Sequence, residues 1–151
     1  MDVKTLVANF IRAADLAGVT IRPEAVAVEM LPAPHRPRIL PPGKMAVYIF
    51  HWGSQCLKVG KAGSKTRARY RYQHYNPRSS KSNLAKSILR DRENLGIAGI
   101  DKGNVGAWIK ENTDRVNILL DDDAGAPVLS LLESFLQCCL RPRFEGFASQ
   151  K

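Results

Sequence analysis

Two apolar runs in the first half of the chain constrain the fold more than any other feature of the sequence. The runs, Ala46 to Phe50 and Cys56 to Gly60, flank a connection of five residues that contains Gly53. This pattern predicts a β-hairpin. If the turn is symmetric about Gly53, Tyr48 lies directly across from Lys58, and the phenol and the ammonium group share one face of the sheet. The opposite face is then apolar and carries Val47, Ile49, Leu57 and Val59.

The rest of the chain reads mainly as amphipathic helices, because apolar residues recur at steps of three and four. Residues 19–30 are ambiguous: Val19 to Ile21 fit a short strand, and Pro23-Glu24 can open a helical turn that carries Ala25, Val28 and Met30. We therefore expect an α/β (α+β) fold with a small three-stranded sheet, antiparallel or mixed, flanked by helices. The helices are predicted at about residues 3–17, 65–75, 83–92, 105–112 and 127–140, and the third strand at residues 115–120.

Prolines divide the chain into two parts. Residues 31–43 hold five of the nine prolines. Such a segment is extended and cannot join the interior of a sheet. We predict an N-terminal helix and a Pro-rich arm in residues 1–43, followed by a compact domain in residues 44–151.

The net charge of +9 comes from one segment of the chain. Residues 61–92 hold ten of the 23 Lys and Arg residues and one of the 14 acidic residues, which leaves 13 basic and 13 acidic residues elsewhere. A basic segment beside aromatic residues indicates a polyphosphate partner such as a nucleic acid. The alternative is a solvated surface helix followed by a positively charged loop.

The cysteines and two of the histidines give no sign of a metal cluster. Cys56, Cys138 and Cys139 lack C-x-x-C spacing and the even number of a disulfide scaffold. His35 and His51 have no companions at ligand spacing, and we expect both on the surface. Free thiols fit a reducing compartment, so we predict a cytoplasmic location. No apolar run approaches the roughly 20 residues of a membrane span, and no membrane partner is expected.

The order of motifs in the second part of the chain resembles the GIY-YIG nuclease domain family. Val47-Tyr48-Ile49 is followed by Lys58-Val59-Gly60, then by the Arg-rich helix, and then by a lone Glu133 on the final apolar helix. The similarity runs from Ala46 to Gly146. It implies that the chain is an endonuclease that hydrolyses DNA phosphodiester bonds.

The resemblance assigns roles to the hairpin residues. Tyr48 matches the tyrosine of the first motif, which is implied to act as a general base or to position the attacking water. Lys58 stands where most members have the second tyrosine. Some restriction enzymes that resemble this family also have lysine at this position. A neighbouring ammonium group would favour the phenolate of Tyr48. Glu145 departs from the family pattern, because it stands where asparagine is usual.

The Arg-rich helix supplies the phosphate clamp that the resemblance implies. Arg69 lies near the position of the family's arginine, and a guanidinium group can hold a phosphate with two hydrogen bonds. Arg71 is the alternative in a shifted register. His74 falls near the helix histidine or tyrosine of the family, a position for which Tyr70 and Tyr72 also compete.

Glu133 is the candidate metal ligand. An ionised carboxylate without a partner is costly near an apolar core, so its place on an apolar helix calls for an explanation. It is either an exposed residue at the helix edge or, as the resemblance implies, the ligand of a divalent metal ion. Mg²⁺, with Mn²⁺ as the alternative, suits a site made of one carboxylate, waters and phosphate oxygens.

DNA is the expected partner, and the sequence leaves open whether two copies pair as a homodimer to cut both strands. Two other functions remain open: a non-catalytic nucleic-acid-binding module with a degenerate site, and a protein-interaction domain. The expected DNA contacts are the basic residues around the Arg-rich helix, namely Lys61, Lys65, Arg67, Arg71, Arg78 and Lys81.

Overall fold

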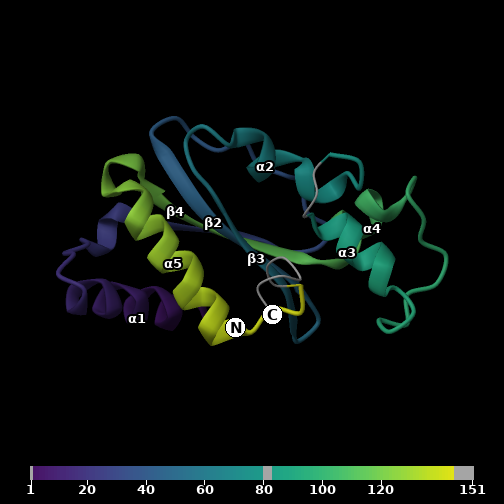
Figure 1. The fold of residues 1–151 in the computed structure, drawn as a ribbon, viewed down its shortest axis with the longest axis horizontal. Helices are drawn as coiled ribbons and strands as arrows, with labels where there is room; N and C mark the ends of the chain where they lie inside the picture. Colours follow the sequence, from purple (N-terminus) through teal and green to yellow (C-terminus); the bar gives the residue numbers. More distant parts are fainter. Residues whose placement is uncertain (1, 80–82, 145–151) are drawn as a thin grey trace.

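A computed structural model describes residues 2–79 and 83–144 and has a four-stranded sheet at its centre (Figure 1). The strands lie in the order β1-β4-β2-β3, and every neighbouring pair is antiparallel. The predicted α/β fold is confirmed, with one more strand than expected. The strands are β1 (Val26–Leu31), β2 (Lys44–Trp52), β3 (Gln55–Ala62) and β4 (Asp114–Asp121).

The extra strand comes from the ambiguous segment before the Pro-rich arm. A short 3₁₀ turn, η1 (Pro23–Ala25), leads into β1, which pairs along its whole length with β4. The helical turn expected to carry Ala25, Val28 and Met30 is therefore wrong beyond η1, and the short strand expected at Val19 to Ile21 does not form. Val26, Val28 and Met30 alternate with the period of a strand.

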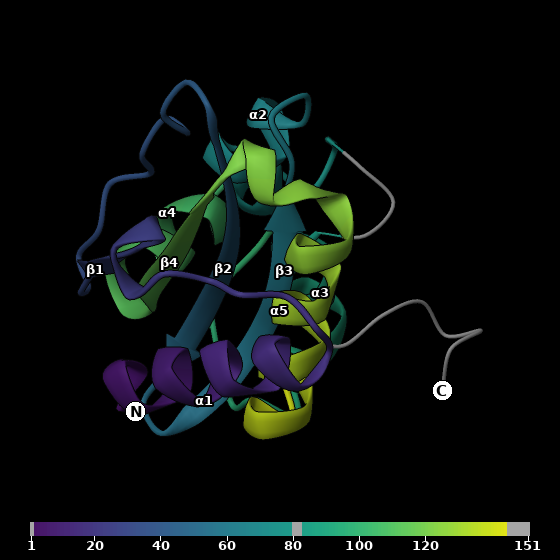
Figure 2. The same cartoon turned by 90° about the vertical axis from the view of Figure 1, so that its left-hand side faces the viewer.

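Helices cover both faces of the sheet (Figure 1). The helices α1 and α5 pack against the face that carries Val47, Ile49 and Val59. The helices α2, α3 and α4 pack against the face that carries Tyr48 and Phe50. The turned view shows α1 lying across the lower part of α5 (Figure 2). The bounds are α1 (Val3–Leu16), α2 (Arg67–Arg71), α3 (Leu84–Asp91), α4 (Val105–Asn112) and α5 (Gly125–Leu140).

Four of the five predicted helices are confirmed, and the Arg-rich one is broken. It consists of α2 and a 3₁₀ turn, η2 (Gln73–Tyr75), separated by Tyr72 with a φ of −138°. The break lets Tyr70, His74 and Tyr75 all point inward, while Tyr72 remains 54% exposed. In a continuous helix Tyr70 and His74, four residues apart, would share a face, but Tyr75 would lie on another side.

The hairpin has a different register from the symmetric one that we predicted. Its turn has two residues between β2 and β3. Beyond the pair of His51 with Cys56, a β-bulge shifts the register between Phe50 and His51. Tyr48 therefore pairs with Gly60, and Lys58 pairs with Phe50, so the predicted pairing of Tyr48 with Lys58 is wrong. Tyr48 and Lys58 still share a face, because they are displaced by two positions along the strands.

The bulge also moves Leu57 to the other side of the sheet. Leu57 was expected on the face of Val47, but it packs in the core that contains Tyr48. A bulge sets two residues of one strand opposite a single residue of its partner, which interrupts the alternation of faces. Leu57 and Lys58 consequently follow one another on the same side.

The Pro-rich arm is extended, as predicted, and it is anchored to the domain by His35. The His35 side chain is 5% exposed, so the prediction that it lies on the surface is wrong. Its Nδ1–H donates to the carbonyl of Thr113 at 2.7 Å, and its Nε2 accepts from the Tyr75 hydroxyl at 2.8 Å. His51 is half-buried, and its Nε2 has no hydrogen-bond partner within the described ranges.

The division at residue 43 stays a prediction. The helix α1 and strand β1 come from the first part of the chain and pack on the same sheet as the rest, with Phe10 of α1 at 6.2 Å from Phe135 of α5 between ring centroids.

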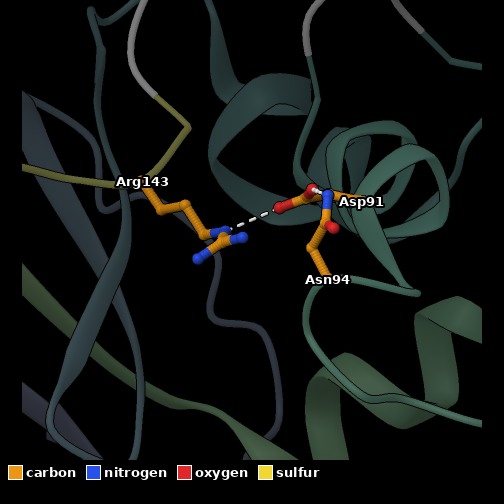
Figure 3. Close-up of polar contacts among 3 residues, drawn as sticks. All are labelled: Asp91, Asn94 and Arg143. Atoms are coloured by element: carbon orange, nitrogen blue, oxygen red, sulfur yellow. Dashed lines mark hydrogen bonds and ion pairs between the residues drawn. The ribbon is translucent and has the colours of Figure 1, made fainter.

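The segment after α5 returns to the outer edge of β3. The backbone N–H groups of Arg143 and Phe144 donate to the carbonyls of Cys56 and Leu57 at 3.0 and 2.9 Å. The Arg143 guanidinium group donates to the Asp91 carboxylate at 2.6 Å, and Asn94 donates to the other oxygen of that carboxylate (Figure 3). These contacts tie residues 143 and 144 to β3 and Arg143 to α3.

The cysteines form no disulfide in the described part of the chain: Cys56 is buried, and Cys138 and Cys139 are exposed. Among the residues that the structure describes, no helix combines the length and the apolar character of a membrane span.

Candidate active site

The side chain of Tyr48 crosses the edge strand of the sheet over Gly60. Tyr48 lies on β2, and Gly60 is its partner on β3, the strand at the outer edge. A Cβ atom placed on Gly60 would lie 2.6 Å from the Tyr48 hydroxyl oxygen and 2.8 Å from two atoms of its ring. The absence of a side chain at residue 60 therefore lets the phenol extend toward the edge of the sheet.

The hydroxyl of Tyr48 meets His74 in the interior. The distance from Nε2 of His74 to the Tyr48 oxygen is 2.6 Å, and each residue is 1% exposed. The other ring nitrogen, Nδ1, accepts from the backbone N–H of Leu84 at 3.3 Å. Because Nδ1 accepts, the proton of a neutral ring lies on Nε2, which donates to Tyr48. The phenol proton is thus free to point to another acceptor.

Both members of this pair are held in their neutral forms. Burial is the main cause that lowers the pKa of His74 well below 6.5, and the nearby charges of Lys58, Arg115 and Arg69 lower it further. Burial likewise raises the pKa of the Tyr48 phenol far above its ordinary value, against the smaller opposing effects of Arg69 and Arg115. The structure thus gives no support to the hypothesis that Lys58 holds Tyr48 as a phenolate.

Lys58 lies beside this pair on the same face of the sheet. Its residue is 7% exposed, and burial, followed by the charge of Arg69, lowers the pKa of its ammonium group. The carboxylate of Glu133 acts in the opposite direction and raises that pKa. An anion in contact with Lys58 would add to this stabilisation of the charged form.

Arg69, rather than Arg71, is the arginine turned toward the site. Arg69 is half-buried, and its charge affects the pKa values of Tyr48, Lys58 and His74. Arg71 is exposed, and its guanidinium carbon lies 5.8 Å from the centre of the Tyr72 ring. The geometry thus favours the first of the two registers that the sequence left open.

Glu133 reaches the site from α5, on the other face of the sheet. Its charge raises the pKa values of Tyr48 and Lys58, which places the carboxylate near the edge that both side chains approach. Its Oε2 accepts from Lys61 Nζ at 2.8 Å, and the same nitrogen donates to Ser130 Oγ at 3.0 Å. Its side chain is 19% exposed, so Glu133 is an ion-paired residue at the rim rather than a fully exposed one.

Sequence reasoning missed Arg115, which lies under the site. Arg115 is 0% exposed and donates to the side-chain oxygen of Asn117 at 2.8 Å, to the Tyr75 hydroxyl at 3.0 Å and to the Tyr70 carbonyl at 2.7 Å. Its guanidinium carbon is 5.5 Å from the centre of the Tyr48 ring. Arg115 therefore fixes the broken helix and Tyr48 in relation to the sheet.

A signal for Arg115 was present in the sequence. Arg115, Asn117 and Leu119 alternate along the third predicted strand and must share one face. Two polar residues on a face that is otherwise buried indicate a hydrogen-bonded network in the core. The network continues to Glu29 on β1, whose carboxylate accepts from Asn117 and from the Tyr70 hydroxyl, each at 3.0 Å.

Comparison of the chain with protein-family models, curated proteins and solved structures finds no match. The GIY-YIG resemblance therefore depends on the motifs alone and stays a prediction.

The remaining predicted DNA contacts differ in their exposure to solvent. Lys65, Arg67 and Arg78 are exposed, and Lys61 is half-buried in its contact with Glu133. Lys81 lies outside the described residues, as does Glu145, which the resemblance set against an asparagine. The exposed members are therefore accessible from solvent, and their contact with DNA stays a prediction.

The donor set fits a divalent ion only in the presence of an anion. In residues 2–79 and 83–144, no group of three or more His, Cys, Asp and Glu side chains is placed to hold a metal ion. The charge of Glu133 acts on both Tyr48 and Lys58, and Lys61 pairs with one of its oxygens. Mg²⁺ keeps several waters and takes further oxygens from phosphates, so one carboxylate and a bound phosphate make a sufficient set.

Proposed function

We propose that this chain is a metal-dependent endonuclease that hydrolyses phosphodiester bonds of DNA. The observation that carries the proposal is the convergence at one sheet edge of a buried Tyr48–His74 pair, Lys58, Arg69 and Glu133, which come from β2, β3, α2, η2 and α5. Such a group provides positive charge for a phosphate and one carboxylate for a metal ion, which are the two requirements of this chemistry.

The cationic side chains bind the phosphate and stabilise the charge that builds on its oxygens. Arg69 holds the phosphate from the partly exposed rim, and Lys58 lies deeper, where a low dielectric strengthens its effect. Water adds to the phosphorus, the bond to the leaving oxygen breaks, and the protons exchange with solvent at the rim. A divalent ion bound at Glu133 would acidify the attacking water and withdraw charge from a phosphate oxygen.

Tyr48 has the role of positioning the attacking water. Burial keeps its phenol protonated at neutral pH, and its oxygen accepts a hydrogen bond from His74. The phenol proton then serves as a directed donor to the water or to a phosphate oxygen. Of the two roles that the resemblance implies for Tyr48, the geometry favours the second.

The test is nicking of supercoiled plasmid by the purified protein in Mg²⁺ or in EDTA. We expect nicking that needs the metal ion, is abolished by Glu133→Gln and falls strongly in Tyr48→Phe. Glu111→Gln is the matched control, because Glu111 is exposed on α4. Nicking that survives Glu133→Gln, or that is absent from the unaltered protein, would overturn the proposal.

A non-catalytic nucleic-acid-binding module is the second candidate. The observation that favours it is the enclosure of the site: Tyr48 is 1% exposed, and Lys61 already pairs with Glu133. If this candidate is correct, the protein binds DNA in a salt-sensitive manner and does not nick the plasmid. Absence of both binding and cleavage would point to a protein-interaction domain.

The free thiols support a reducing compartment as the location. The exposed Cys138 and Cys139 are neighbours in sequence, and neither is paired. We place the protein in the cytoplasm on this ground, and alkylation of these thiols in unbroken cells without prior reduction would test it.

A further inference from the structure

A basic pocket lies beside the candidate active site, between α5 and the loop that joins β3 to α2. Its volume is about 340 Å³. We define the basic pocket by three cationic side chains and two hydroxyl-bearing ones, with Gly63 and Leu129 completing its wall. These five residues are Lys61, Ser64, Lys65, Thr66 and Arg69.

The walls of the basic pocket favour an anion. No acidic side chain belongs to its lining, whereas three cationic side chains do. Lys61 is steadied by its contacts with Glu133 and Ser130 at 2.8 and 3.0 Å. The cationic side chains therefore keep a net positive charge in the pocket, with hydroxyl groups beside them as further hydrogen-bonding partners.

The loop that forms the floor is closed by its own hydrogen bonds. The backbone N–H and the hydroxyl of Thr66 both donate to the carbonyl of Gly63, at 3.0 and 3.1 Å. The positions of Ser64 and Lys65 are thus set by a short turn before any ligand binds. A preformed wall reduces the ordering cost of binding.

Arg69 belongs to both the basic pocket and the candidate active site. It lines the pocket, and its charge acts on Tyr48, Lys58 and His74. Two anions held on either side of one guanidinium group are close neighbours, as successive phosphates of a nucleic-acid strand are. A lone phosphate would satisfy the charge of the pocket but would not explain why it adjoins the site.

We propose that the basic pocket is a second phosphate subsite, which takes the backbone phosphate next to the one held at the candidate active site. The identity of the ligand as a nucleic-acid strand rests on the proposed function, whereas the binding itself needs neither metal nor cleavage. The smallest ligand that fills both positions carries two consecutive backbone phosphates.

The experiment compares short ligands by NMR titration of the labelled protein in EDTA at low salt. The probes are inorganic phosphate, a thymidine dinucleotide with one backbone phosphate and a thymidine trinucleotide with two. We expect the trinucleotide to bind clearly more tightly than the dinucleotide, and the dinucleotide more tightly than inorganic phosphate. Equal affinity for the two nucleotides, or tighter binding of inorganic phosphate, would overturn the subsite.

Lys65→Met is the variant that tests the pocket, because Lys65 is exposed and lies outside the candidate active site. We expect the variant to bind the trinucleotide no more tightly than the dinucleotide. We also expect the steepness of the plot of log affinity against log salt concentration for the trinucleotide to fall by about 0.7. Lys102→Met, at an exposed position in the loop before α4, is the matched control and should keep both.

A Lys65→Met protein that keeps the gain would refute the assignment. Failure of the proposed function is seen separately. If the protein has the subsite but no hydrolytic activity, the trinucleotide still binds more tightly than the dinucleotide in EDTA, and plasmid is not nicked in Mg²⁺.

Discussion

Replacing Gly60 by alanine tests how the site is built. An alanine Cβ would lie 2.6 Å from the Tyr48 hydroxyl oxygen and 2.8 Å from two ring atoms, which is closer than such atoms approach one another in proteins. Tyr48 cannot swing aside at low cost, because it is 1% exposed and its ring packs against Phe50 and His74, with centroids at 6.0 and 4.7 Å. The substitution must therefore move a packed side chain.

The expected loss of stability follows from two opposing effects. Overpacking a close-packed core costs about 1–3 kcal/mol. Against it, replacing glycine stabilises a protein by about 0.4–1 kcal/mol, because the unfolded chain loses conformational freedom. Gly60 has no positive φ that would penalise alanine. The steric effect is the larger one, and we expect Gly60→Ala to lower the free energy of unfolding by roughly 0.5–2 kcal/mol.

Urea unfolding followed by circular dichroism measures this change. Gly63→Ala is the matched control three residues along the chain, since a Cβ at Gly63 meets nothing within 4 Å. We expect it to be neutral or slightly stabilising. The substitution at Gly60 should also disturb the hydrogen bond between Tyr48 and His74, which NMR of the His74 ring would detect.

A double-mutant cycle isolates the contact. In Tyr48→Leu the shorter side chain no longer reaches over Gly60, so adding Gly60→Ala to it should cost much less than in the unaltered protein. Equal costs in the two backgrounds would refute the idea that the ring of Tyr48 crosses the strand at this glycine. Equal stability of Gly60→Ala and Gly63→Ala would refute it as well.

Three further predictions concern other polar contacts. Arg115→Met leaves buried acceptors such as the Tyr75 hydroxyl without a donor, and we expect it to lower the free energy of unfolding by about 2–4 kcal/mol in urea titrations. In the folded protein the pKa of His74 lies below 6.5, so the unfolded chain binds the extra proton and stability falls as the pH drops below that value. His74→Gln should flatten that fall by up to about 1.4 kcal/mol per pH unit, and an unchanged slope would contradict it. The hydrogen bond from Arg143 lowers the pKa of Asp91 below 3.8. We therefore expect Asp91→Asn to be less stable than the unaltered protein at neutral pH, and this difference in stability to disappear as the pH falls through the lowered pKa. Unfolding midpoints of both proteins at neutral and acidic pH check this, and a difference independent of pH would count against the pair.

The local patterns of the sequence were sufficient for most elements of the fold. The predicted helix at 105–112 agrees with α4, and the strand at 115–120 lies within β4. These segments have a period or flanking residues that decide their structure locally. The strand β1 was missed, and its residues were expected in a helical turn, because a short apolar run becomes an edge strand only when β4 offers a partner, and pairing across the chain is not a local property.

The turn and the bulge together explain the largest error in the hairpin. A turn symmetric about Gly53 gave a direct pairing of Tyr48 with Lys58, but the two-residue turn shifts the pairing by one position and the bulge in β3 by a second. The bulge also carries Leu57 across the sheet. Nothing in the composition of the two strands marks a bulge. The shared face of Tyr48 and Lys58 survived the error because the displacement is an even number of residues.

Parts of the site were also open to prediction, whereas its supporting contacts were not. The family resemblance implied that Tyr48, Lys58 and Glu133 belong to one site, and in the structure the charge of Glu133 acts on both other side chains. Their catalytic roles stay a prediction. His35 was assigned to the surface because it lacks neighbours at ligand spacing. Its hydrogen bonds instead join residues 40 and 78 positions apart, and only the folded chain brings such partners together.

The balance of charge at the site bears on what it can bind first. Lys61 pairs with one oxygen of Glu133, and the charges of Arg69 and Glu133 both act on Lys58. A divalent cation alone would meet repulsion from these three basic side chains. A phosphate group reverses this, because its negative charge offsets the cationic side chains and its oxygens complete the coordination shell. If the proposed function is correct, we therefore expect an anion to bind first and a metal ion to bind only after it.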